Sequence, residues 1–306
     1  MFKSVTVTND RGESLELPLA WPNDAGLLIS NIEGITPTEV DIATSDYAML
    51  DGGYFNSARM GVRNITIEMY YSFIPHIETA RHKAYRYFPI KSKVRLDFLT
   101  DERKLMIEGY VEGNDTKIFS EQEMGQISIV CPDPYFYEST PQTYILGSSV
   151  PEFEFPFSNE SLTEKLICFS DYGPYNLWTI DYQGDMEVGI TITVRFKKKP
   201  TFDKLTVYDV THNKTLVLDF EELKEKTSVV DFEEYGNIVF SSVRGHKAIY
   251  YERFGKITNI IGAFDVQNFP WMYLTPGENV FAFDIQQAYL DEIDVVIEHK
   301  GAYGGV

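Results

Sequence analysis

The feature that most restricts the fold of this chain is a period of two in its hydrophobicity. Apolar and polar residues alternate most clearly at 64–73, and the pattern returns at 94–98, 126–131 and 188–196. This alternation places every second side chain on one face of a β-strand. The chain is therefore predicted to be mainly β.

One segment departs from this period. The stretch PHIETARHKAYRYFP, residues 75–89, places Ala80 and Ala84 at helical spacing. Pro75 suits the first turn of a helix, and Pro89 ends it. The sequence predicts one α-helix here, with an apolar stripe that covers a sheet.

Prolines indicate where the chain divides. Five of them fall between residues 132 and 156, and proline cannot donate to a sheet ladder. We interpret 132–156 as an extended linker between an N-terminal domain, residues 1–140, and a C-terminal domain, residues 141–306.

The C-terminal domain is predicted to be a β-sandwich, because short strands and turn residues follow one another regularly. A hairpin is expected at 209–220 with its turn near Asn213, and another at 232–240 with its turn at Gly236–Asn237. Strands at 278–285 and 292–299 are expected to form a final pair.

The charge of the chain excludes some partners. Lys and Arg total 27 against 46 acidic residues, which gives a formal net charge of −19. Such a chain repels phosphate, so stable binding to nucleic acid or to an anionic membrane surface is not expected.

No catalytic pattern is present. The five histidines form no metal-binding spacing, and neither a nucleophile elbow nor a phosphate-binding glycine motif occurs. The densest acidic clusters, 219–222 and 231–234, are expected to be solvated hairpin rims. The sequence therefore predicts no enzyme activity, no cofactor and no metal site.

Several segments resemble the distal tail protein (Dit) family of long-tailed bacteriophages, in order and spacing across nearly the whole chain. The most distinctive are LDGGYFNSAR with RNI at 50–65 and CPDPYFY at 131–137. The stretches at 78–98 and 107–131 and the ending YLTPGENVFAFDI…YGGV carry the rest of the resemblance.

The resemblance implies a fold and a role. The N-terminal domain would be a tail-tube-like β-barrel or sandwich with one α-helix, and the C-terminal domain a β-sandwich similar to galectins or carbohydrate-binding modules. Six copies would form a ring, a structural hub of the virion at the tail tip or baseplate, assembled from protein made in the bacterial cytoplasm. The hub would join the tail tube to a tip protein or tail-associated lysin, hold receptor-binding proteins in some members, and let DNA pass through its lumen.

Two groups of candidate site residues follow. Gly52, Gly53, Arg59 and Arg63 lie in the most distinctive segment and are predicted to contribute to the ring interface, since arginine is favoured at interfaces. An alternative function is a carbohydrate-binding adhesin that contacts the host cell wall. Three aromatic residues of the C-terminal domain are candidates for stacking on sugar rings: Trp178, Trp271 and Tyr273.

Overall fold

The computed structural model describes residues 2–19, 25–73, 76–120, 122–146, 150–151, 170–171, 177–227, 229, 231–285 and 292–306. These residues are mainly β, with two short α-helices and several antiparallel sheets, so the predicted β class is confirmed. The chain divides into two compact units, Met1–Thr140 with Ala302–Val306 and Pro141–Gly301. No helix in the described part of the chain is long and apolar enough to cross a bilayer.

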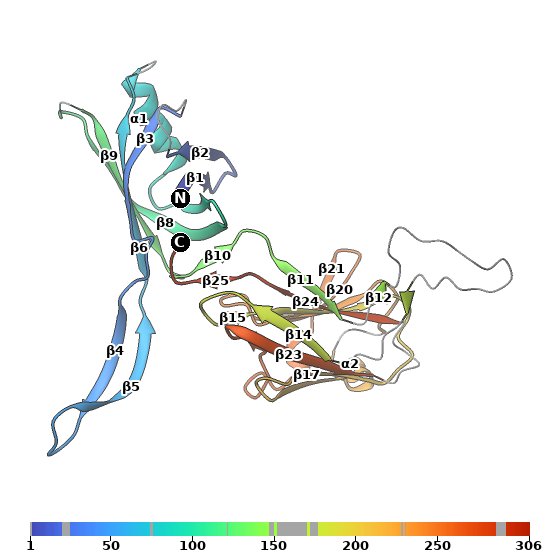
Figure 1. Ribbon diagram of the computed structural model, residues 1–306. Helices are drawn as coiled ribbons and strands as arrows, with labels where there is room; N and C mark the ends of the chain where they lie inside the picture. The colour runs from blue at the N-terminus through green and yellow to red at the C-terminus, as the bar shows by residue number, and fades with distance from the viewer. Residues whose placement is uncertain are drawn as a thin grey trace, which may run out of the picture. The chain divides into compact units, whose positions relative to one another are not determined.

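The first unit is built on a nine-stranded antiparallel sheet (Figure 1). Its main path runs β2-β1-β7-β8-β9-β6-β3, and β10 pairs with both β8 and β25. The bounds are β1 (Phe2–Asn9), β2 (Ser14–Pro18), β3 (Leu27–Glu33), β6 (Arg63–Tyr71), β7 (Lys93–Thr100), β8 (Lys104–Lys117), β9 (Met124–Cys131), β10 (Phe136–Glu138) and β25 (Ala302–Tyr303). A separate two-stranded sheet joins β4 (Val40–Asp46) to β5 (Gly53–Met60).

The alternation in the sequence sets the core of this unit. Along β6, Ile65, Ile67 and Met69 are buried while the residues between them are partly or fully exposed. The helix α1 (Ile77–Tyr87) buries Ala80 and Ala84 in the same core, as its spacing predicted. Its cap at the N-terminus is His76, and Pro75 lies outside the described residues.

The chain leaves the first unit and returns to it through two neighbouring strands. β10 pairs antiparallel with β25, with Phe136 opposite Tyr303. Tyr303 is buried, and its hydroxyl donates to Glu138 at 2.9 Å. The sequence assigned 302–306 to the second domain, but this cross-strand pairing places them in the first. The predicted linker, 132–156, also contributes strands, at Phe136–Glu138, Gln142–Leu146 and Val150–Pro151.

Two larger sheets make up the second unit, a six-stranded one of order β11-β24-β16-β19-β20-β21 and a four-stranded one of order β14-β23-β17-β18 (Figure 1). The strands of the first are β11 (Gln142–Leu146), β16 (Thr191–Phe196), β19 (Asn237–Ser241), β20 (Ala248–Arg253), β21 (Lys256–Asn259) and β24 (Ile293–His299). Those of the second are β14 (Leu177–Tyr182), β17 (Lys204–Asp209), β18 (Lys214–Asp219) and β23 (Gly277–Asp284). Short pairs are β12 (Val150–Pro151) with β13 (Ser170–Asp171) and β15 (Val188–Gly189) with β22 (Tyr273–Leu274).

The hairpin predicted at 209–220 is confirmed: β17 pairs with β18, and Asn213 has a φ of 52° in the turn. The other two pairings are wrong. β19 pairs with β16 and β20, so Gly236 connects no hairpin. β23 and β24 lie in different sheets: β23 pairs with β14 and β17, and β24 pairs with β11 and β16.

The acidic cluster at 219–222 is also not a hairpin rim. Asp219 caps the helix α2 (Phe220–Lys226) by accepting from the backbone N–H of Glu222 at 3.2 Å. Phe220 and Leu223 are buried, so the helix is held by its apolar side. The second cluster, 231–234, lies in a loop and buries Phe232.

The returning strand generates a prediction about the first unit. Residues 1–140 joined by a short Gly-Ser linker to 302–306 should unfold at a higher temperature than residues 1–140 alone, because β25 and buried Tyr303 complete the sheet. Thermal unfolding followed by circular dichroism measures the difference. Equal midpoints would mean that the C-terminal residues add no stability.

A second prediction concerns acid. Arg86 donates to Glu13, with Nε at 3.0 Å, and this hydrogen bond, followed by one from Asn9, lowers the pKa of Glu13 from 4.5 to about 2. A depressed carboxyl pKa stabilises the fold above pH 4.5, and the contribution disappears as the pH falls towards 2. Glu13→Gln should therefore lower the melting temperature at neutral pH, with the difference from the unmodified protein shrinking below pH 4.5. Glu16→Gln, at an exposed position on β2, is the control and should leave the melting temperature at neutral pH unchanged.

Candidate functional site

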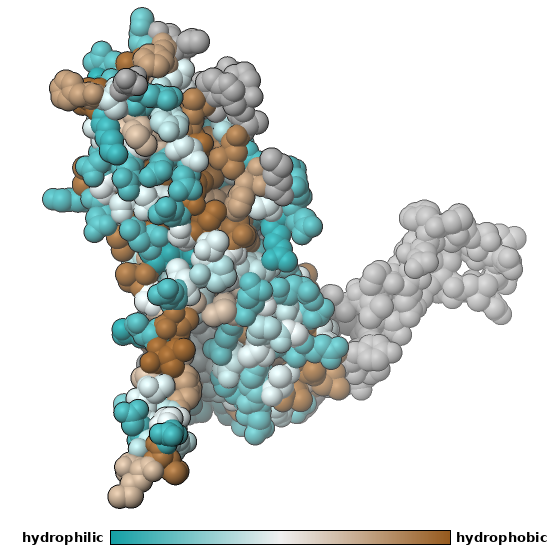
Figure 2. All heavy atoms as spheres, turned by 60° about the vertical axis from the view of Figure 1, so that its left-hand side comes forward, coloured by the Kyte–Doolittle hydropathy of each residue, from teal (hydrophilic) through white to brown (hydrophobic). Residues whose placement is uncertain are grey.

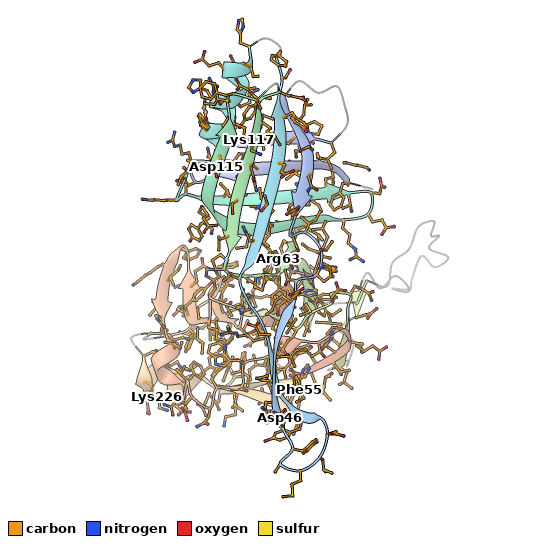
Figure 3. All side chains as sticks on the ribbon, turned by 90° about the vertical axis from the view of Figure 1, so that its left-hand side faces the viewer. Asp46, Phe55, Arg63, Asp115, Lys117 and Lys226 are labelled. Atoms are coloured by element: carbon orange, nitrogen blue, oxygen red, sulfur yellow. The ribbon has the colours of Figure 1, made fainter. Side chains whose placement is uncertain are left out.

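The strands β4 and β5 form a ribbon that extends beyond the ends of β3 and β6 (Figures 1 and 3). They pair only with each other, from Val40 opposite Met60 to Asp46 opposite Gly53. Nearly every residue of the ribbon is exposed. A two-stranded ribbon by itself is only marginally stable in water.

The ribbon has one apolar and one polar face. Directly opposed residues share a face of an antiparallel pair, so the register puts five apolar side chains together: Val40, Ile42, Phe55, Ala58 and Met60. Ile42 is 62% exposed and Phe55 is 65% exposed. Figure 2 shows apolar side chains gathered along the ribbon. Within its own unit nothing described covers this face.

The polar face carries Asp41 and Arg59, whose side chains lie 3.6 Å apart. Both are more than three-quarters exposed, so this ion pair contributes little to stability. Arg59 is thus free to meet another chain, and its predicted interface role stays a prediction.

The tip of the ribbon is apolar as well. Met49 is 94% exposed and Leu50 is 74% exposed. Gly52 has a φ of 91°, which a side chain tolerates poorly, and a Cβ on Gly53 would lie 2.7 Å from the carbonyl oxygen of Ser45. The two glycines therefore shape the turn that presents the tip.

Arg63 lies at the root of the ribbon, where β6 begins (Figure 3). Only 1% of it is exposed. Its guanidinium donates to four backbone carbonyls, those of Pro134 and Gly34 at 2.6 Å, Thr36 at 2.7 Å and Gly304 at 2.6 Å. It also lies over the ring of Phe136, 4.7 Å from the centroid.

These contacts hold Arg63 inside its own unit, and the interface role predicted for it stays a prediction. Burial lowers the pKa of Arg63, and its donors are directed at carbonyls of its own unit. The different environments of Arg63 and Arg59 could not be predicted from the sequence, because the carbonyls that Arg63 binds lie 27 to 241 residues away along the chain.

The aromatic candidates of the second unit already contact other side chains. Trp178 stacks on Phe283, with centroids 5.0 Å apart. Tyr273 lies 4.3 Å from the ring of His212, and the Lys214 Nζ lies 3.8 Å from its centroid. These contacts leave less ring surface for stacking on a sugar.

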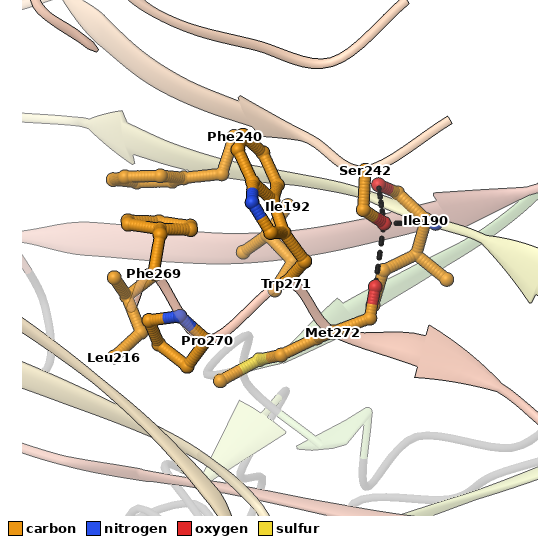
Figure 4. Close-up of a pocket in the computed structure, with 9 residues that line it drawn as sticks. All are labelled: Ile190, Ile192, Leu216, Phe240, Ser242, Phe269, Pro270, Trp271 and Met272. Carbon is orange, nitrogen blue, oxygen red and sulfur yellow. Dashed lines mark hydrogen bonds between the residues drawn. The ribbon is translucent and has the colours of Figure 1, made fainter. Parts of the chain in front are cut away.

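Trp271 lines a small pocket with Phe240 and Phe269 (Figure 4). Its ring lies 4.6 Å from that of Phe269, and the Lys247 Nζ lies 5.0 Å from it. The polar side chain of the lining, Ser242, hydrogen-bonds to backbone atoms of Ile190 and Met272. The lining holds no charged group that could act as an acid or base.

Among the described residues, no three His, Cys, Asp or Glu side chains lie close enough together to hold a metal ion. The ribbon, whose apolar face is exposed, is the feature that points to a role.

Comparison with known proteins gives a structural likeness. The chain is similar to the SPP1 Dit protein (gp 19.1), described as a paradigm of the hub adsorption apparatus in phages that infect Gram-positive bacteria. The TM-score is 0.62 at 15% identity, over 97% of this chain and 99% of that one. A chain of the phage P2 baseplate, in its activated conformation with calcium, gives a TM-score of 0.49 at 10% identity, over 98% and 99% of the two chains.

No protein-family model matches the sequence, and no curated protein does. The likeness to SPP1 Dit shows a fold shared over nearly the whole chain, in agreement with the family that the sequence resembles. The tail-tube-like form expected for the first unit stays a prediction. A galectin-like form of the second unit stays a prediction.

The two arginines give a matched test. Arg63→Ala should lower the free energy of unfolding by about 3 kcal/mol or more, because it removes four hydrogen bonds from a charged donor and leaves buried carbonyls without partners. Arg59→Ala, on the exposed ribbon, should change it by less than about 0.5 kcal/mol. Urea unfolding measures both. If Arg63→Ala does not fold, Arg63→Lys is used instead, because it keeps the charge with fewer donors, and its free energy of unfolding should be intermediate. Equal effects of Arg63→Ala and Arg59→Ala would contradict the structural role given to Arg63.

Proposed function

We propose that this protein is a structural hub of a bacteriophage tail tip, in which six copies close into a ring through their first units. The observation that carries the proposal is the amphipathic ribbon, whose apolar face is uncovered in the single chain. The fold shared with SPP1 Dit supports the same role.

A neighbouring copy is the occupant that suits the ribbon best. A ribbon that leaves its own unit and lies on the next copy makes a contact between two different surfaces. Such heterologous contacts close into a ring when the rotation between copies divides a full turn. The uncovered face then becomes buried in every copy.

Charge supports passage of DNA through such a ring. The chain has a formal net charge of −19, so an acidic lumen would repel the phosphate backbone and keep DNA from adhering. In this proposal the ring joins the tail tube on one side to a tip protein or tail-associated lysin on the other, and carries receptor-binding proteins in addition. The proposal assigns no catalytic step to the chain.

Oligomeric state tests the proposal. Light scattering of the purified protein should give a mass near that of six chains of 35.1 kDa, about 211 kDa, or twice that if rings stack. Ile42→Ser with Phe55→Ser should shift the protein to monomers, because burying each apolar side chain contributes about 1.5–3 kcal/mol to every interface.

The polar face of the ribbon supplies the control. Ser57→Ala changes the same ribbon on its polar face without touching the apolar side chains, and should leave most rings intact. Circular dichroism checks that all variants remain folded. A wild-type protein that stays monomeric at high concentration, or rings that survive in the Ile42/Phe55 variant, would count against assembly through this face.

A further inference from the structure

The outer face of the four-stranded sheet in the second unit has an uncharged centre. Along β14, β23, β17 and β18, buried residues alternate with residues that are partly or fully exposed, and the exposed ones share the outer face. We call the centre of this outer face the neutral face. Its residues are Leu177, Thr179, Thr206, Tyr208, Thr215, Val217, Val280 and Ala282.

The strand register makes the neutral face continuous. Residues directly opposed on antiparallel strands share a face of the sheet. One row crosses all four strands, each residue opposite the next: Leu177, Ala282, Tyr208 and Thr215. The charged residues of the outer face lie at its borders: Asp181, Lys204, Asp219, Glu278 and Asp284. Leu177 is 63% exposed and Val217 is 45% exposed, so solvent reaches both sides of the neutral face.

The six-stranded sheet of the same unit has a different outer face. Asp294, Arg195 and Glu252 lie in one row across β24, β16, β19 and β20. Their neighbours along the strands, such as Val194 and Tyr251, are buried on the other side of the sheet. Charged side chains in the middle of a face suit contact with water. An uncharged patch bordered by charges is instead typical of an interaction surface.

The side chains of the neutral face suit contact with an identical face. Three of its eight residues are threonines and one is a tyrosine. A hydroxyl group both donates and accepts hydrogen bonds, so two such faces can meet without leaving a donor opposite a donor. Two chains of formal net charge −19 repel each other, and the neutral face lets them meet without bringing carboxylates together.

The neutral face is too small to hold two single chains together. Four strands about 4.8 Å apart, over about five residues of about 3.4 Å each, cover roughly 300 Å². A stable interface buries about 800 Å² on each partner. Repetition overcomes this limit, because once one contact between two rings has formed, the other contacts form within the same assembly.

We propose that the neutral face docks onto the same face of a second copy and thereby joins two rings of six into an assembly of twelve. This contact is isologous, so it relates two copies by half a turn. Neighbours within a ring of six are related by a sixth of a turn, so the second copy belongs to a different ring. The inference rests on the proposed function, because the ring supplies the repeated contacts.

The mass of the assembly tests the proposal. Light scattering of the full-length protein at increasing concentration should show rings of six pairing into twelve chains of 35.1 kDa, about 420 kDa. Leu177→Glu with Val217→Glu places carboxylates on the neutral face, where they would meet those of the second copy. This variant should remain a ring of six and should need at least about a hundredfold higher concentration to pair.

The six-stranded sheet supplies the matched control. Ile145→Glu with Ile257→Glu adds the same charge to the chain, at exposed apolar residues of β11 and β21. This control should pair as readily as the wild-type protein. Added salt should promote pairing of wild-type rings, because it screens the repulsion between acidic chains and breaks no ion pair in an uncharged contact. Circular dichroism checks that both variants are folded.

The outcomes separate this proposal from the proposed ring. Rings of six that never pair, even at high concentration and high salt, would overturn the pairing and leave the ring standing. A protein that stays monomeric would contradict both. Assemblies of twelve that survive in the Leu177/Val217 variant, or that are lost equally in the control, would also overturn docking through the neutral face.

Discussion

The hydrogen bonds that the buried guanidinium of Arg63 donates to four backbone carbonyls hold the first unit together. Four carbonyls receive its hydrogen bonds, and they come from three separate segments of the chain. Gly34 and Thr36 lie between β3 and β4, Pro134 precedes β10, and Gly304 follows β25. One buried cation therefore holds together the root of the ribbon, the segment before β10 and the segment after β25, all within the first unit. A buried charge is costly unless it is fully hydrogen-bonded, and here backbone carbonyls meet that requirement.

This arrangement explains how an otherwise unsupported ribbon can keep its direction. Close packing at the root adds to the effect, since a Cβ on Gly34 would lie 2.0 Å from the carbonyl oxygen of Asn64. The final residue also contributes, because the Val306 N–H donates to the Ile35 carbonyl at 3.0 Å. The root is closely packed and hydrogen-bonded while the rest of the ribbon is exposed, which suits the proposed contact with another copy.

Much of the local structure could be predicted from the sequence, because it depends on neighbours along the chain. Alternation at 64–73 determined β6, the spacing of Ala80 and Ala84 determined the buried side of α1, and Asn213 marked a turn. Which strands pair with one another was harder to predict, because the hydrophobic pattern is similar in all buried strands. The pairing of β19 with β16, and the separation of β23 from β24, depend on packing between distant segments.

The sequence by itself determined the β class, the single helix of the first unit and the acidic charge, since each follows from residue types and their period. It also pointed to 50–71 as the most informative segment. Only the tertiary structure decided what its residues do. Arg59 and Arg63 are four residues apart and chemically identical, yet one is solvated on a ribbon and the other is enclosed by carbonyls. That difference arises because the chain end and the segment before β10 fold back onto Arg63, and no local pattern encodes contacts between residues 241 positions apart.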